Sequence, residues 1–321
     1  MSATLLEVRD LTVDYPTDAG LVRVVDGIDL TIGRGERVAI VGESGSGKSV
    51  ACRALLRLDP ESIIGGSVRF DGKSVLDMSR RELTAYRGSS VGMVFQDPFG
   101  SLDPGMRIGD QVSDSLRRQG VSKQEAEARA LRTLEELGVP RAADRMRAYP
   151  HELSGGLRQR VSLAMGLVAE PQLLIADEVT TALDTRVQRQ VLDLMYLAFR
   201  ARAMSVVLIS HDLGVVASFA DRVVIVYAGR IVEEGPIDEI FAAPRHPYTQ
   251  GLLAAVPRID AGDRPLVAIP GSPPTPARRP SGCAFHPRCP QRFDRCEAAI
   301  PALVGVGQGR RVACHLHDGQ G

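Results

Sequence analysis

Hydrophobic and polar residues alternate near the start of the chain. Leu5–Val13 and Val22–Ile32 both follow the period of two that half-buried strands show. Val38–Val41 is a continuous apolar run, which predicts a buried strand, and a helix-compatible stretch, Val50–Leu58, comes soon after it. We therefore expect the first part of the chain to be rich in β-structure.

The middle of the chain, roughly 105–169, has the spacing of helices. Ser122 and Glu125 form the sequence pattern of a capping box, and Gly138 is placed to end that helix. Three leucines fall on one helical face: Leu131, Leu134 and Leu137.

The remaining pattern alternates between strands and helices. Apolar strands and amphipathic helices are expected at Val91–Phe95, Leu173–Ala176, Arg186–Arg200, Ser205–Ser210, Leu213–Ala220 and Val223–Tyr227. Such alternation predicts an α/β fold with a mostly parallel sheet between helices.

Residues 42–49 form a complete G-x-x-x-x-G-K-S phosphate loop between the expected strand and helix. Its glycines allow successive backbone N–H groups to face an anion, and the next helix directs its positive end toward the same place. The predicted nucleotide-binding residues are Gly42, Ser44, Gly45, Ser46, Gly47, Lys48 and Ser49. Lys48 is expected to reach the β- and γ-phosphates of a nucleoside triphosphate, and Ser49 to bind Mg²⁺. A tight turn is the alternative, but the full spacing disfavours it.

Two carboxylates follow the expected strand Leu173–Ala176. Asp177 is predicted to hold Mg²⁺, and Glu178 to polarise the attacking water. Acidic residues often end strands, so the signal depends on the phosphate loop earlier in the chain.

Ser154, Gly155 and Gly156 open another predicted helix, whose first N–H groups offer a second anion site. An ordinary helix cap would look the same in isolation. Combined with the phosphate loop and the Asp-Glu pair, the segment 153–160 resembles the signature motif of ATP-binding-cassette (ABC) ATPases. The resemblance covers about residues 5–245.

The resemblance implies further roles. Tyr15 matches the aromatic residue that stacks on adenine, with an ordinary strand residue as the alternative. Gln96 matches a glutamine that binds Mg²⁺ or water, Asp184 lies in the D-loop, and His211 matches the residue that contacts the γ-phosphate. Catalysis is thus assigned to Glu178, His211, Gln96 and Lys48.

The same family implies a cassette over 1–256, with an antiparallel β-subdomain and a helical subdomain at about 97–169. Its signature segment acts on ATP held by a second nucleotide-binding domain, so hydrolysis requires a dimer.

Several stretches resemble the oligopeptide/dipeptide importer branch, in particular 42–49, 95–98, 157–160, 246–253 and 282–289. That branch implies a D-type subunit with a partner ATPase, two permeases and an extracytoplasmic solute-binding protein. We expect ATP-driven peptide uptake at the cytoplasmic side of the cell membrane. Nickel, glutathione or another solute is the alternative, followed by a soluble ABC ATPase outside transport. Val179 and Asp103 depart from the residues that are usual in the family, proline and asparagine.

Composition limits the other possibilities. Lys+Arg and Asp+Glu both number 39, so no bulk positive charge favours nucleic acid. The start lacks the pattern of a signal peptide, and no apolar run approaches the roughly 20 residues of a membrane span.

The end of the chain has a different character. A proline-rich linker is expected over 257–280 and a cysteine-rich extension over 281–321. Its four cysteines are Cys283, Cys289, Cys296 and Cys314. Their wide spacing, without a CxxC pair, favours a [4Fe–4S] cluster, and the branch resemblance supports it. Zinc, free thiols and disulfides remain alternatives.

Overall fold

A computed structural model describes residues 3–97, 100–179, 185–256 and 268–319. The chain forms two compact units. Unit 1 comprises Met1–Thr4, Ile32–Arg37 and Asp77–Ile209, and unit 2 comprises Leu5–Thr31, Val38–Leu76 and Ser210–Gly321.

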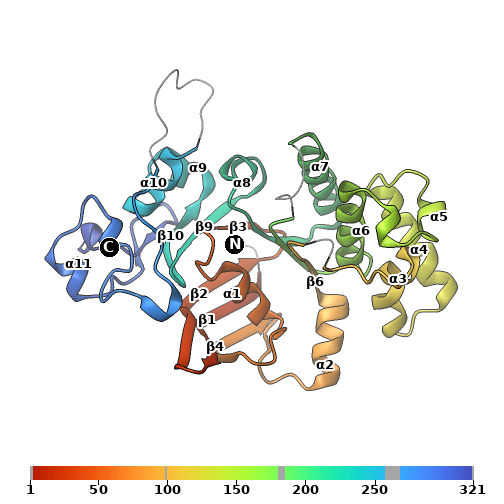
Figure 1. Ribbon diagram of the computed structural model, residues 1–321, viewed down its shortest axis with the longest axis horizontal. Helices are drawn as coiled ribbons and strands as arrows, with labels where there is room; N and C mark the ends of the chain where they lie inside the picture. The colour runs from red at the N-terminus through yellow and green to blue at the C-terminus, as the bar shows by residue number, and fades with distance from the viewer. Residues whose placement is uncertain (1–2, 98–99, 180–184, 257–267, 320–321) are drawn as a thin grey trace. The chain divides into compact units, whose positions relative to one another are not determined.

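Unit 1 contains three parallel strands with helices around them. Strand β7 (Leu173–Asp177) pairs with β6 (Val91–Val94) on one side and with β8 (Ser205–Ile209) on the other. All five residues of β7 and of β8 are buried, as expected of strands covered on both faces. The helices are α2 (Arg80–Ala85), α3 (Ile108–Arg118), α4 (Lys123–Glu136), α5 (Ala142–Arg145), α6 (Gly155–Leu167) and α7 (Thr185–Arg202), with a π-helical turn at Tyr86–Ser90 and a 3₁₀ turn at Pro150–Glu152. Figure 1 shows α3, α4 and α6 packed side by side.

Unit 2 begins with an antiparallel sheet in the order β2-β1-β4-β5. Its strands are β1 (Thr4–Thr17), β2 (Gly20–Gly33), β4 (Ile63–Phe70) and β5 (Lys73–Ser74). Outside that sheet, β3 (Arg37–Val41) pairs in parallel with β9 (Arg222–Tyr227). Strand β9 also pairs antiparallel with β10 (Arg230–Pro236). The helices are α1 (Lys48–Leu55), α8 (Leu213–Phe219), α9 (Ile237–Ala242), α10 (Pro247–Ala254) and α11 (Asp294–Ala298).

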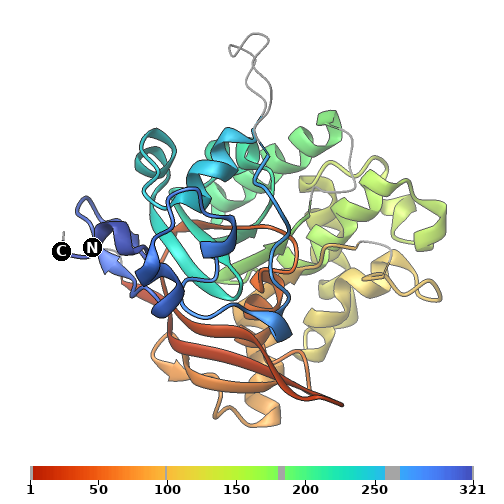
Figure 2. The same cartoon turned by 60° about the vertical axis from the view of Figure 1, so that its left-hand side comes forward.

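The C-terminal tail, here residues 268–319, is built onto unit 2. Its strand β12 (Arg311–Val312) pairs with β10 on one side and with β11 (Val304–Gly305) on the other. Figure 2 shows these residues, in blue, lying against the β9–β10 strands. Phe285 is only 2% exposed and belongs to the same hydrophobic core as β3, β9 and α10. The tail therefore shares the core of unit 2.

The elements expected from the sequence are present, with boundaries shifted by a few residues. The expected antiparallel sheet and parallel strands are both found. Two details of the elements predicted from the sequence were wrong. Ser122 caps α4 by accepting the N–H of Glu125, but the Glu125 carboxylate pairs with Arg129, so the reciprocal half of the capping box is missing. Strand β6 ends at Val94, and Phe95 is exposed.

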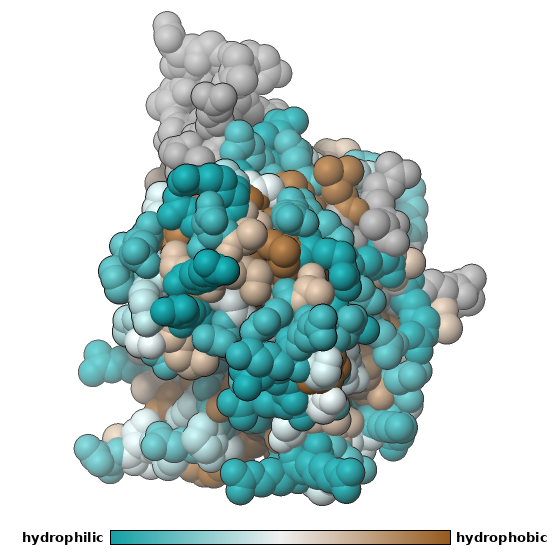
Figure 3. All heavy atoms as spheres, turned by 90° about the vertical axis from the view of Figure 1, so that its right-hand side faces the viewer, coloured by the Kyte–Doolittle hydropathy of each residue, from teal (hydrophilic) through white to brown (hydrophobic). Residues whose placement is uncertain are grey.

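Figure 3 shows the side on which α4 and α5 lie, whose surface is mainly hydrophilic with small apolar patches. In the part of the chain that the structure describes, no helix is both long and apolar enough to cross a bilayer.

Close packing of α6 on β6 gives a test of unit 1. A Cβ added at Gly92 would lie 2.1 Å from the carbonyl oxygen of Gly166. We expect Gly92→Ala to lower the free energy of unfolding by about 1–3 kcal/mol, because neither backbone can withdraw. At Gly88 the added Cβ would meet only the Gln119 side chain at 3.6 Å. Gly88→Ala is the control in urea unfolding, and equal midpoints for the two variants would contradict the packing.

Candidate functional site

The phosphate loop lies in unit 2, between β3 and α1. Gly47 caps α1 with a φ of 97°, a conformation that favours glycine. Gly42 has no space for a side chain, since an added Cβ would lie 2.1 Å from the carbonyl oxygen of Val226. Lys48 is 5% exposed, and its ammonium donates to the carbonyl oxygens of Gly42 at 2.8 Å and Glu43 at 2.9 Å. The loop thus closes around the lysine that was expected to bind phosphates.

The other residues of the loop differ in exposure. Ser44 and Gly45 are exposed, Ser46 is buried, and Ser49 is half-buried in the first turn of α1. The phosphate loop is therefore accessible to solvent at Ser44 and Gly45.

Glu43 is a loop residue whose contacts the sequence did not reveal. Its backbone N–H donates to the hydroxyl of Tyr248 at 2.8 Å, and its carboxylate accepts two hydrogen bonds from Arg288. Tyr248 lies in the stretch 246–253 and Arg288 in the stretch 282–289, both of which resemble the importer branch. No local pattern signals a pair separated by 245 positions.

Tyr15 lies in β1 and is half-buried. Its hydroxyl donates to the carboxylate of Asp59 at 2.6 Å. Burial, followed by this hydrogen bond to Asp59, raises the pKa of Tyr15 to about 12. The bond fixes the ring, and whether the ring stacks on adenine stays a prediction.

Three of the expected catalytic and metal-binding residues lie in unit 1. Asp177, at the end of β7, is 4% exposed. Glu178 follows with a φ of 48°, and its N–H donates to the carbonyl oxygen of Ile209 at 3.0 Å. Gln96 Nε2 donates to Glu178 Oε2 at 3.0 Å. Glu178 thus has a left-handed backbone conformation, and hydrogen bonds hold both its N–H and its carboxylate. A carboxylate with a fixed orientation of this kind can position a water molecule.

The signature segment opens α6 in unit 1. Ser154 is the N-cap residue, yet its hydroxyl makes no capping hydrogen bond, and Ser154 and Gly155 are both exposed. A Cβ added at Gly155 would meet nothing within 4 Å. This helix N-terminus, with Gly156 in its first turn, is therefore open to an incoming anion.

His211 lies two residues after β8, in unit 2, and is exposed. The next residue, Asp212, caps α8 by accepting the N–H groups of Gly214 and Val215. Asp184 falls outside the described residues.

The four cysteines of the tail line one small cavity in unit 2 and form no disulfide. Burial raises the pKa of the thiols of Cys283, Cys289 and Cys314, in the last case to about 11. Across the described parts of the chain, however, no group of three His, Cys, Asp or Glu side chains is placed so that it could hold a metal ion. The expected iron–sulfur or zinc centre is thus not supported by the arrangement of the side chains.

His246 lines the same cavity. Its Nδ1 accepts the N–H of Tyr248 at 3.0 Å, so a neutral ring carries its proton on Nε2. Burial lowers the pKa of His246 to about 3, which keeps the ring neutral at physiological pH. The Nε2 atom is buried without a hydrogen-bond partner.

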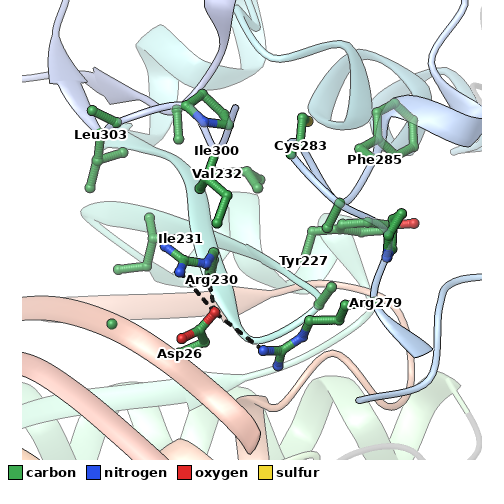
Figure 4. Close-up of a pocket in the computed structure, with 18 of the residues that line it drawn as sticks. Asp26, Tyr227, Arg230, Ile231, Val232, Arg279, Cys283, Phe285, Ile300 and Leu303 are labelled. Carbon is green, nitrogen blue, oxygen red and sulfur yellow. Dashed lines mark hydrogen bonds and ion pairs between the residues drawn. The ribbon is translucent and has the colours of Figure 1, made fainter. Parts of the chain in front are cut away.

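A larger cavity of about 370 Å³ lies between β2, the β9–β10 hairpin and the tail. On one side the carboxylate of Asp26 bridges Arg230 and Arg279, as the dashed lines in Figure 4 show. The opposite wall contains Val232, Cys283, Phe285, Ile300 and Leu303. The single carboxylate of Asp26 offsets one of these two positive charges, and both guanidinium groups are engaged in its ion pairs.

Comparison with known families gives two matches. The profile of the ABC transporter family matches residues 25–181, and that of the oligopeptide/dipeptide transporter C-terminal region matches residues 232–296.

Relatives match along nearly the whole chain. A peptide import ATP-binding protein of Brucella abortus is 46% identical over 98% of this chain and 95% of its own length. The oligopeptide transport ATP-binding protein OppD of Salmonella typhimurium is 46% identical over 97% of this chain and 93% of its own. The oligopeptide transport ATP-binding protein AppD of Bacillus subtilis is 44% identical over 99% of this chain and 98% of its own length.

Solved structures show the same fold. The post-hydrolysis dimer of the ATP-binding cassette MJ0796, bound to ADP and Pi, has a TM-score of 0.66 and 28% identity. The match covers 73% of this chain and 99% of that one. The ABC cassette fold, with a mixed sheet and helices, is confirmed.

The buried position of Gly42 gives a test of the loop. We expect Gly42→Ala to weaken ATP binding at least about tenfold, because the added methyl group displaces the backbone that Lys48 bridges. The measurement is titration of the purified chain with a fluorescent ATP analogue. Gly88→Ala, outside the phosphate loop and the signature segment, where the added Cβ meets only the Gln119 side chain at 3.6 Å, is the control and should keep the wild-type affinity. Wild-type affinity in Gly42→Ala would contradict this account of the loop.

Proposed function

The chain belongs to the family of ABC transporter ATP-binding proteins that carry the oligopeptide/dipeptide transporter C-terminal region, and from this we propose that it hydrolyses ATP to drive peptide import. The observation that carries the proposal is the phosphate loop closed around Lys48 in a chain nearly half identical to peptide import ATP-binding proteins.

In the proposed complex with ATP, the phosphates are bound by the backbone N–H groups of the phosphate loop and by the Lys48 ammonium. Lys48 now donates to loop carbonyls, and a phosphate oxygen offers it a stronger, charge-assisted acceptor. Ser49, Asp177 and Gln96 are assigned to Mg²⁺, which neutralises charge on the phosphates when it is bound.

Glu178 is the residue assigned to the attacking water. The amide of Gln96 holds its carboxylate, and its own N–H is fixed on Ile209, so the carboxylate keeps one orientation. His211 is assigned to the γ-phosphate, and Tyr15 to adenine.

The open N-terminus of α6 supports a role for Ser154, Gly155 and Gly156 on ATP held by a second cassette. Asp184 is assigned to the same dimer contact. The proposed assembly contains a partner ATPase, two permeases and an extracytoplasmic solute-binding protein. It places this chain at the cytoplasmic face of the membrane through the permeases, with no contact to nucleic acid.

Peptide uptake in cells that carry only Glu178→Gln tests the proposal. We expect ATP hydrolysis and uptake of labelled di- and oligopeptides to fall about 100-fold or more, since the amide cannot polarise water as a carboxylate does. Nickel uptake should be normal. The control is Glu135→Gln, the same chemical change at an exposed position of α4.

Normal peptide uptake with lost nickel uptake would assign the chain to a different solute. Normal uptake of both, with lost hydrolysis, would place the ATPase outside the transport of these solutes.

We also propose that the four tail cysteines bind a [4Fe–4S] cluster, with zinc as the alternative. Four thiols on one cavity provide the right number and kind of ligands, and the unpaired Nε2–H of His246 lines the same space. Binding requires the cysteine side chains to move closer together than they lie in the cavity. The cluster would crosslink a tail that contains little secondary structure.

Metal analysis of anaerobically purified protein tests this second proposal. We expect iron and sulfide, or zinc, in Cys289→Ser to fall to background, because one ligand is lost. Cys52→Ala, at a cysteine buried in α1, should keep the wild-type content. Wild-type chain free of metal would refute the proposal.

A further inference from the structure

We propose that Arg288 of the tail is a positioning residue for the phosphate loop, and that ATP affinity depends on its ion pair with Glu43. This inference rests on the proposed binding of ATP by residues 42–49.

The pair has the geometry of a strong ionic interaction. Arg288 Nη1 donates to Glu43 Oε2 at 2.6 Å, and Nη2 donates to Oε1 at 2.9 Å. Both terminal nitrogens of the planar guanidinium thus face both oxygens of the carboxylate, which fixes direction as well as distance. The Arg288 side chain is 6% exposed and that of Glu43 is 25% exposed, so solvent screens the pair less than it would at the surface.

Arg288 is itself held in place, which is what makes it able to position another residue. Its Nε donates to the carbonyl oxygen of Pro270 at 2.8 Å, and Nη1 also reaches the hydroxyl of Tyr227 at 3.3 Å. Its guanidinium lies 5.9 Å from the ring centroids of Tyr227 and Phe285. Phe285 is buried in the core of unit 2, so the arginine projects from an anchored segment.

At the other end of the pair, Glu43 is bonded through its backbone as well. Its N–H donates to Tyr248, and its carbonyl oxygen accepts from Lys48. One residue therefore joins the tail to the lysine that is assigned to the phosphates. If the carboxylate loses Arg288, Glu43 is held only through its backbone bonds to Tyr248 and Lys48, and the loop loses its direct ion pair with the tail.

A second contact of the tail lies near the other end of the loop. Arg279 donates to the carbonyl oxygen of Val24 at 2.7 Å and pairs with Asp26, as Figure 4 shows for the pair. A Cβ added at Gly47 would lie 3.1 Å from that Val24 oxygen. The tail thus reaches the neighbourhood of both ends of the loop, through Val24 at one end and through the direct bond from Arg288 to Glu43 at the other.

A double-mutant cycle on the full chain tests the pair. The variants are Arg288→Gln, Glu43→Gln and the double variant, and the measurement is the Kd of a non-hydrolysable ATP analogue with Mg²⁺. We expect each single variant to raise Kd about fivefold or more, and the double variant to raise it no further than the worse single one. Arg288→Lys should recover part of the loss, because it keeps the charge and loses the fork.

Two controls separate the possible failures. Arg295→Gln removes an exposed ion pair of the tail with Asp318, and it should leave Kd unchanged. Lys48→Ala should abolish binding if the loop is the ATP site. Wild-type Kd in folded Arg288→Gln, or fully additive losses in the cycle, would overturn the positioning role. Wild-type Kd in Lys48→Ala would instead overturn the proposed ATP site.

Discussion

Unit 2 depends on a buried carboxylate in β10. Glu233 is fully buried and accepts hydrogen bonds from the backbone N–H groups of Arg245 and His246 and from the guanidinium of Arg310. A buried charge with all of these partners is tolerated, whereas removal of the Arg310 guanidinium would leave an uncompensated ion at a cost of about 3–5 kcal/mol. The start of α10 and the end of the tail are therefore fixed on the same strand by one side chain.

Two lines of contact lead from Glu233 to the phosphate loop. Through His246, which caps α10, it fixes Tyr248, whose hydroxyl accepts the N–H of Glu43. Through Arg310 it holds the tail, which also carries Arg288. The tail is thus bound to the cassette by ion pairs, strand pairing and a shared core. Any metal in the cysteine cavity would add to these contacts.

Features that depend on local sequence were predictable. The phosphate loop, β7 with its terminal carboxylates and the start of α6 each combine a strand or helix pattern with residues whose chemistry needs that place. Side-chain contacts between segments that are distant in the sequence were not predictable. Glu43 and Arg288 are individually ordinary residues, and only the fold shows that they meet. The Glu125 carboxylate was misassigned because Arg129, one turn later, competes for it.

The loop and the signature segment differ in how their polar groups are used. At Glu43 the N–H, the carbonyl oxygen and the carboxylate all have partners within unit 2. At Ser154 the hydroxyl makes no capping bond and the helix N-terminus faces solvent. A loop that must bind its own nucleotide gains from being preorganised, because less freedom is lost on binding. A segment that acts on a partner's nucleotide must instead leave its donors open. Under the proposed assignment, the same chain carries one prepared half of an ATP site and one exposed half, which is the arrangement that a dimeric ATPase requires.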